Sequence, residues 1–115
     1  MIRMNYKICF VCTGNACRSP FAECVTKKLL ADARMNGIEV FSLGTLDWGK
    51  NPRDVAMVDV ARELGYELSG TTTVMTRERL MMADTVIVFD ERHRDAVTRV
   101  LDYSHWNRIV LFNKI

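Results

Sequence analysis

The chain has 115 residues, 49% of them apolar and 26% charged, and its formal net charge is only +2. This composition predicts a single domain, residues 1–115, with a hydrophobic core that needs no disulfide or metal for stability. The small net charge and the lack of a long Lys/Arg run exclude an evident nucleic-acid face, and no apolar stretch of about 18 residues or more indicates a membrane span.

The four cysteines are expected to be thiols rather than disulfides. The segment from Met1 to Lys7 is short and mixed, and the apolar run after it has no small-residue cleavage site, so we expect no signal peptide. A chain without an export signal stays where thiols are reduced, which predicts a cytoplasmic protein.

Short apolar segments alternate with amphipathic ones along the chain. Strands are predicted at 8–11, 38–43, 85–89 and 109–112. Helices are predicted at about 19–36, at 51–64, after residue 76 and at 91–101. Near-continuous apolar strands separated by helices predict an α/β fold of three layers, with a four-stranded parallel sheet covered by helices on both faces.

In such sheets ligands bind beyond the carboxyl ends of the strands, so we expect the functional site where the first strand ends, at Cys12. Five residues separate Cys12 from Arg18, in a loop between the first predicted strand and the first predicted helix. A loop this short can curl until successive backbone N–H groups point at one spot, which makes an anion site beside the positive end of the helix. The predicted phosphate-binding residues are Thr13, Gly14, Asn15, Ala16, Cys17 and Arg18.

The residues of this loop are expected to have different roles, some through the backbone and some through their side chains. Gly14 is expected to supply backbone angles closed to other residues, and Asn15 tolerates the left-handed conformation. A cysteine beside an arginine at a helix N-terminus is stabilised as a thiolate, so Cys12 is the predicted nucleophile. The Ser19 hydroxyl can donate to its sulfur, and the planar Arg18 guanidinium matches two phosphate oxygens. These groups suit nucleophilic attack on phosphorus.

The motif Cys-x-Gly-Asn-x-Cys-Arg-Ser-Pro, directly after an apolar strand, resembles the low-molecular-weight protein tyrosine phosphatase family. The resemblance continues at Ser42-Leu43-Gly44-Thr45, Asp47-Trp48 and Phe89-Asp90-Glu91. It implies a hydrolase of phosphotyrosine or aryl phosphates that works through a cysteinyl-phosphate intermediate without a metal or cofactor. Inorganic phosphate would be its product or an inhibitor. By matching position, the resemblance implies that Asn15, Ser19 and Ser42 support the loop and that Trp48 flanks the substrate ring.

Two departures from the family pattern bear on catalysis. The family usually carries an Asp-Pro pair after the fourth strand, whose Asp is the general acid, and then a final helix; this sequence stops at Ile115 before either. The histidine that helps to hold the family's phosphate loop is absent from Ser69-Gly70-Thr71-Thr72-Thr73. We therefore expect weakened activity, with Asp47 or Asp90 as possible substitute acids. We also expect a bare apolar flank that can bind a second copy of the chain.

Three functions compete at this point. The first is a phosphomonoesterase, and the second is a module that recognises phosphate without turning it over. The third is an arsenate reductase, which can share this loop but relays electrons through further cysteines near the end of the third strand, and residues 81–92 contain none.

The remaining cysteines and histidines have simpler interpretations. Cys17 is either a plain loop residue or a resolving thiol that forms a reversible disulfide with Cys12. Cys9 and Cys12 have zinc-like spacing but point to opposite faces of a strand, and no second pair follows, so no metal is predicted. Cys9 and Cys24 are assigned to the core, His93 to a solvated helix face and His105 to the surface.

Overall fold

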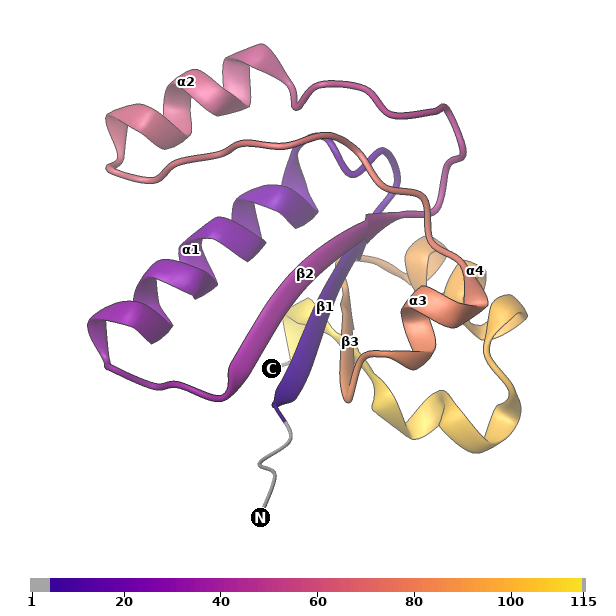
Figure 1. Ribbon diagram of the computed structural model, residues 1–115. Helices are drawn as coiled ribbons and strands as arrows, with labels where there is room; N and C mark the ends of the chain where they lie inside the picture. The colour runs from indigo at the N-terminus through magenta and orange to yellow at the C-terminus, as the bar shows by residue number, and fades with distance from the viewer. Residues whose placement is uncertain (1–4, 115) are drawn as a thin grey trace.

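The computed structural model describes residues 5–114 and contains one sheet of four parallel strands (Figure 1). The strands β1 (Tyr6–Cys12), β2 (Ile38–Gly44), β3 (Thr85–Val88) and β4 (Ile109–Leu111) are arranged in the order β2-β1-β3-β4. The register pairs Cys12 with Gly44, and Val11 with Val88. The carboxyl ends of the strands therefore meet at one edge of the sheet, and the predicted fold class is confirmed.

Helices lie on both sides of this sheet. The α-helices are α1 (Arg18–Asp32), α2 (Val55–Glu63), α3 (Arg77–Met81) and α4 (Glu91–Val100), and two 3₁₀ segments span Tyr103–Arg108 and Phe112–Lys114. Figure 1 shows α1 and α2 to one side of the strands and α3 and α4 to the other. In the described part of the chain, no helix has both the length and the apolar character needed to cross a bilayer.

The core lies between the sheet and the helices on its α4 side. β1 is an inner strand and its last four residues are buried, which explains why its sequence is apolar without alternation. The buried cluster consists of Cys9, Val11, Leu43, Leu80, Ala83, Val86, Val88, Val97 and Leu101. This packing fixes the end of β1, and with it the position of the loop that follows.

Two helix starts differ from the sequence predictions. α1 begins one residue before Ser19, with Cys17 at the N-cap position, because the Ser19 side chain is buried against the loop instead of capping the helix. α2 begins at Val55 rather than near Pro52, because the Asp54 carboxylate accepts the Met57 N–H at 3.0 Å and caps the helix there.

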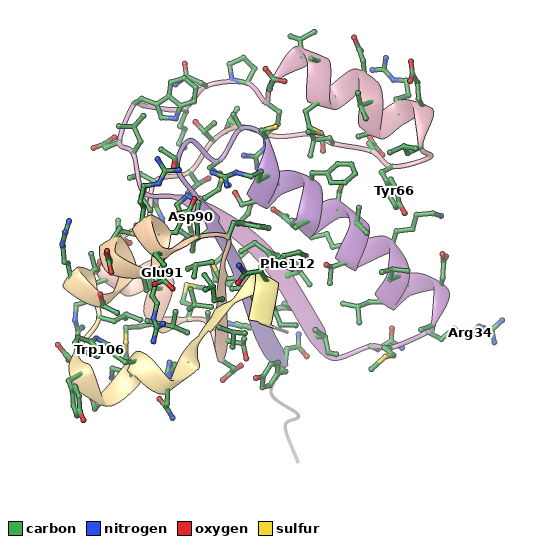
Figure 2. All side chains as sticks on the ribbon, turned by 180° about the vertical axis from the view of Figure 1, so that it is seen from behind. Arg34, Tyr66, Asp90, Glu91, Trp106 and Phe112 are labelled. Carbon is green, nitrogen blue, oxygen red and sulfur yellow. The ribbon has the colours of Figure 1, made fainter. Side chains whose placement is uncertain are left out.

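An apolar groove of about 440 Å³ runs along the exposed flank of α1. Its lining includes Phe10, Phe21 and Phe89, and Phe112, which is half-exposed (Figure 2). This agrees with the expected bare flank, and its occupation by a second copy stays a prediction.

Candidate active site

The loop between β1 and α1 has its carbonyl groups turned outward. Each of five successive carbonyl oxygens accepts a hydrogen bond from the neighbouring segment, residues 45–54. The Thr45 N–H donates to the Cys12 carbonyl and the Leu46 N–H to the Thr13 carbonyl, each at 2.9 Å. The Trp48 indole donates to Gly14 at 3.0 Å. Arg53 donates to Asn15, and the Asp54 N–H donates to Ala16 at 3.0 Å. In a trans peptide the N–H points away from the C=O, so the N–H groups of residues 13–17 face the concave side. This is the geometry of an anion-binding nest, and phosphate binding by these residues stays a prediction.

The Cys12 sulfur lies at the floor of this nest. It is 3% exposed, accepts the Asn15 N–H at 3.3 Å and lies 2.9 Å from the Ser19 hydroxyl oxygen. Because that oxygen accepts a bond from the Asn15 amide at 2.9 Å, the Ser19 hydroxyl hydrogen is free to point at the sulfur. The first turn of α1 carries no acidic residue to offset the positive end of the helix. Both donors and the positive end of the helix therefore face the Cys12 sulfur.

Asn15 holds the loop together. Its backbone is left-handed, with φ of 54°, and its side chain is completely buried. The amide nitrogen donates to Ser19 and Ser42, and the amide oxygen accepts from Arg53 and from the Thr73 N–H. The expectation for Asn15 is confirmed, whereas that for Gly14 is wrong, because Gly14 does not adopt a positive φ.

The end of β2 supports the loop from the side. The Ser42 hydroxyl accepts from Asn15 and donates to the Glu23 carboxylate at 2.6 Å. At Gly44 a Cβ atom would lie 2.9 Å from the Thr13 carbonyl oxygen, so only glycine lets the loop pack this closely. Ser42 was predicted to support the loop, but the roles of Glu23 and Gly44 were not predicted, since no local sequence pattern indicates either contact.

Arg18 lies at the rim of the nest. Its side chain is about half-exposed, one guanidinium nitrogen lies 3.5 Å from the Asp90 carboxylate, and its central carbon lies 5.9 Å from the centre of the Phe89 ring. These contacts orient the guanidinium and leave it accessible to an anion in the loop.

Asp90 is a cap and ion-pair residue at the start of α4 (Figure 2). Its carboxylate accepts the Arg92 and His93 N–H groups and pairs with the Arg92 side chain at 3.1 Å. These interactions, the Arg92 side chain first, hold the pKa of Asp90 well below its usual range. A carboxylate that is deprotonated at neutral pH is a poor proton donor, which counts against Asp90 as the substitute acid.

His93 is buried, at 1% exposure. The prediction that it lies on a solvated helix face is therefore wrong. Its Nδ1 accepts the Phe89 and Asp90 N–H groups at 3.3 Å, so the ring proton is on Nε2, which donates to the Thr13 hydroxyl at 3.0 Å. Burial lowers the pKa of His93, Asp90 opposes this shift, and Arg18 and Arg92 add to it, so the ring is neutral. The signal for this role was present: Asp90 and His93 have the spacing of a capping box.

Trp48 contacts the loop, and Asp47 precedes it in the chain. The Trp48 indole N–H is fixed on the Gly14 carbonyl, and 47% of the residue is exposed. This position beside the loop is compatible with the proposed contact to a substrate ring. Asp47 is exposed and lies in the turn between β2 and Trp48.

The other cysteines fall into two environments. Burial raises the pKa of Cys17, Asp54 and Cys12 raise it further, and Arg18 opposes the shift, so Cys17 is a protonated thiol next to the nucleophile loop. Cys9 is a core residue, as expected, and burial also raises its pKa. Cys24 is only partly buried, contrary to the core assignment. Within residues 5–114, no group of three or more His, Cys, Asp or Glu side chains is arranged to hold a metal.

Comparison with known proteins covers almost the whole chain. Residues 7–114 match the profile of a family described as low molecular weight phosphotyrosine protein phosphatase. A low molecular weight protein-tyrosine-phosphatase of Streptomyces coelicolor is 36% identical over 102 residues, which are 84% of this chain and 60% of that protein. An arsenate reductase of Brevibacillus brevis is 36% identical over 103 residues, 89% of this chain and 70% of that protein.

A solved structure shows the same similarity in three dimensions. The crystal structure of a low molecular weight phosphotyrosine phosphatase from Vibrio cholerae O395 superposes with a TM-score of 0.87 at 28% identity, over 94% of this chain and 71% of that one. The chain spans about 60% of the length of the Streptomyces coelicolor relative.

Proposed function

Because the chain belongs to the low molecular weight phosphotyrosine protein phosphatase family, we propose that it hydrolyses phosphotyrosine or aryl phosphates through a phosphocysteine formed on Cys12. The observation that supports this best is the nest of residues 12–18. It brings a buried sulfur with two donors and a run of inward N–H groups to one point, and the Arg18 guanidinium lies at its rim. This arrangement has a nucleophile and anion binding in the same place, which is what phosphoryl transfer requires.

The proposed reaction has two steps. The Cys12 thiolate attacks phosphorus, an S–P bond forms, and the P–O bond to the aryl oxygen breaks, so the aryl oxygen leaves with the bonding pair. Water then attacks phosphorus, the S–P bond breaks, the water gives up its proton, and inorganic phosphate leaves with the thiolate restored. Arg18 and the loop N–H groups stabilise the equatorial oxygens in both steps.

Weakened turnover is part of the proposal for this 115-residue chain. Asp90 is committed to Arg92 and to the start of α4, and Asp47 is an exposed turn residue. Neither is presented to the leaving oxygen by a contact of the kind that holds Cys12 or Asn15.

Substitution of the two catalytic residues tests the assignment. We expect Cys12→Ser to abolish hydrolysis of nitrophenyl phosphate while phosphate or vanadate still binds, because the N–H nest and Arg18 remain. Arg18→Ala should weaken both binding and turnover, by about 10²–10³-fold or more in kcat, as for loss of one oxyanion donor. Undiminished turnover in Cys12→Ser would overturn the assignment.

The same assay separates the two alternatives. A phosphate-binding module would bind vanadate but show no Cys12-dependent turnover with any aryl phosphate. An arsenate reductase would oxidise thiols in the presence of arsenate. The similarity to the Brevibacillus brevis arsenate reductase is the reason to test this reaction, although β3 and the start of α4 carry no cysteine that could supply electrons to reduce an arsenate bound on Cys12.

A further inference from the structure

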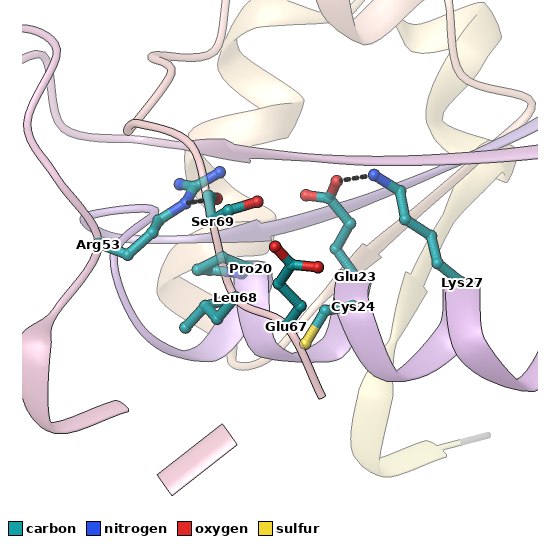
Figure 3. Close-up of a pocket in the computed structure, with 8 residues that line it drawn as sticks. All are labelled: Pro20, Glu23, Cys24, Lys27, Arg53, Glu67, Leu68 and Ser69. Carbon is teal, nitrogen blue, oxygen red and sulfur yellow. Dashed lines mark hydrogen bonds and ion pairs between the residues drawn. The ribbon is translucent and has the colours of Figure 1, made fainter. Parts of the chain in front are cut away.

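Arg53 connects the nucleophile loop to two other segments without reaching the phosphate site. It lies just before α2, and its Nη1 donates to both the backbone and the side-chain oxygen of Asn15, the latter at 2.8 Å. Its Nε donates to the Ser69 carbonyl at 3.2 Å (Figure 3). One planar side chain therefore joins the segment before α2, the segment after it and the loop that carries Cys12.

The residue that Arg53 binds has a left-handed backbone. This conformation is less favourable for asparagine than for glycine, and it persists where the surroundings hold it. The same conformation directs the Asn15 N–H to the Cys12 sulfur and the Asn15 amide to Ser19. The two bonds from Arg53 Nη1 fix the peptide and the side chain of Asn15 together, while the bond from Nε to Ser69 fixes the plane of the guanidinium.

Charge acts in the same direction. Partial burial lowers the pKa of Arg53, and negative charge on Glu23 and on Cys12 opposes this shift, so the guanidinium attracts negative charge at both positions. Arginine stays protonated at neutral pH in any case. Arg53 thus adds a second cation near the nucleophile, besides Arg18.

The other side of Arg53 faces a small pocket of about 210 Å³, lined also by Glu23, Cys24 and Glu67 (Figure 3). Glu23 accepts a bond from Ser42, and Ser42 in turn binds Asn15. Arg53 and Glu23 therefore both reach Asn15 from this pocket, one directly and one through a hydroxyl. The pocket wall and the nucleophile loop share the same hydrogen bonds.

We propose that Arg53 is a positioning residue for the nucleophile, which acts through Asn15 to hold the Cys12 loop in its anion-binding form. The proposal rests on the proposed function, since it assigns Arg53 a part in that reaction. In this proposal Arg53 does not contact the substrate.

The experiment compares Arg53→Ala and Arg53→Lys with wild type, with Arg62→Ala as the matched control. Arg62 is an exposed arginine of α2 that pairs with Asp59. We expect Arg53→Ala to lower kcat for nitrophenyl phosphate about 10²-fold, the scale of a small misplacement of a reacting group. KM should change less, because Arg18 and the N–H groups still bind phosphate. Arg53→Lys keeps the charge but has no second nitrogen to hold Ser69 while the first binds Asn15, so it should also be slow.

Guanidinium rescue distinguishes positioning from a general loss of stability. Millimolar guanidinium chloride should restore part of kcat to Arg53→Ala, whereas methylammonium chloride should not, and neither should affect Arg62→Ala. If Arg53→Ala does not fold, Arg53→Lys decides the question alone. Wild-type kcat in whichever variant folds would overturn the proposal.

A second readout does not depend on catalysis. Iodoacetamide labelling of Cys12, followed by peptide mass spectrometry at fixed pH, should be faster in both Arg53 variants than in wild type and Arg62→Ala, because Cys12 is only 3% exposed and release of the loop uncovers it. If wild type hydrolyses no aryl phosphate, the proposed function fails, and the labelling rate still tests Arg53. Labelling that is unchanged or slower in the variants would contradict a role for Arg53 in holding the loop.

Discussion

On the nucleophile side of the candidate active site, the Cys12 sulfur is hydrogen-bonded to the Asn15 N–H and the Ser19 hydroxyl. The carbonyl oxygens of residues 12–16 accept hydrogen bonds from residues 45–54. Two residues considered for the leaving-group side, Asp47 and Trp48, are instead exposed. The nucleophile side is preorganised for attack on phosphorus, whereas neither Asp47 nor Asp90 is held as a proton donor for the leaving oxygen. Binding and nucleophilic attack are therefore expected to be retained more fully than assistance to the leaving group.

The largest expected effect comes from oxidation of the nucleophile side. Mild peroxide should inactivate the protein completely but reversibly through a Cys12–Cys17 disulfide, because a thiolate oxidises first and only four residues separate the two cysteines. Peptide mapping and recovery with dithiothreitol measure this.

Cys17→Ala is the matched control for the oxidation experiment. Without the second thiol, peroxide should drive Cys12 to sulfinic or sulfonic acid, and dithiothreitol should no longer restore activity. Finding these acids on Cys12 in the wild-type protein, with Cys17 free, would show that Cys17 is not a resolving residue.

Next in size is the dependence on the leaving group. Protonation of the leaving oxygen contributes about 10²–10⁴-fold in general acid catalysis. Nitrophenyl phosphate should therefore turn over readily, and phosphotyrosine, whose phenol has a pKa near 10, much more slowly. Rates for a series of substituted phenyl phosphates should fall steeply with leaving-group pKa, and no descending limb from a general acid should appear at high pH.

Rates that do not change with leaving-group pKa would contradict the expected lack of proton donation to the leaving oxygen. An acid would then be present, and Asp47→Asn and Asp90→Asn would locate it. The Asp90 carboxyl is already held deprotonated by Arg92, so we expect Asp90→Asn to leave the slope unchanged.

A smaller loss is expected when the loop is displaced without removal of a functional group. Gly44→Ala places a Cβ 2.9 Å from the Thr13 carbonyl oxygen and 3.1 Å from the Asn15 nitrogen, so the backbone of the loop must move. We expect kcat to fall about 10²-fold, as for a shift of about 1 Å in a reacting group. Gly14→Ala, whose new Cβ meets only the Trp48 ring at 3.6 Å, should lose less. Equal losses in the two variants would show that the Gly44 contact does not set the loop position.

The smallest effect concerns stability rather than rate. Because burial lowers the pKa of His93, the unfolded chain binds a proton that the folded chain does not as pH falls below the ordinary histidine value of about 6.5. The free energy of unfolding should therefore decrease from pH 7 toward pH 5. Urea titrations of wild type and His93→Gln should show a flatter pH dependence in the variant, with His105→Gln measured to separate the two histidines. An unchanged slope in His93→Gln would contradict the neutral buried ring.

The elements of the fold were predictable to the extent that their signals are local. The apolar runs that became β1 and β3 and the motif from Cys12 to Pro20 specified the parallel sheet and the loop after its first strand. Helix starts were less predictable, because Ser19 and Pro52 resemble start signals while Cys17 and Asp54 occupy the N-cap positions. At Ser19 a contact with the loop competed with the local preference, whereas at α2 another local signal, the Asp54 cap, decided the start.

By itself the sequence determined the nucleophile motif, the guanidinium beside it and the α/β class, since each follows from residue type and short-range spacing. Only the tertiary structure decided which groups hold that motif in place. The three residues that hold the loop lie far from Asn15 in the sequence: Gly44 by 29 residues, Arg53 by 38 and His93 by 78. Each reaches the loop only because the parallel strands end at one edge. Contacts between distant segments leave no periodicity or motif in a single sequence, because they depend on where the backbone returns and not on the residues beside them.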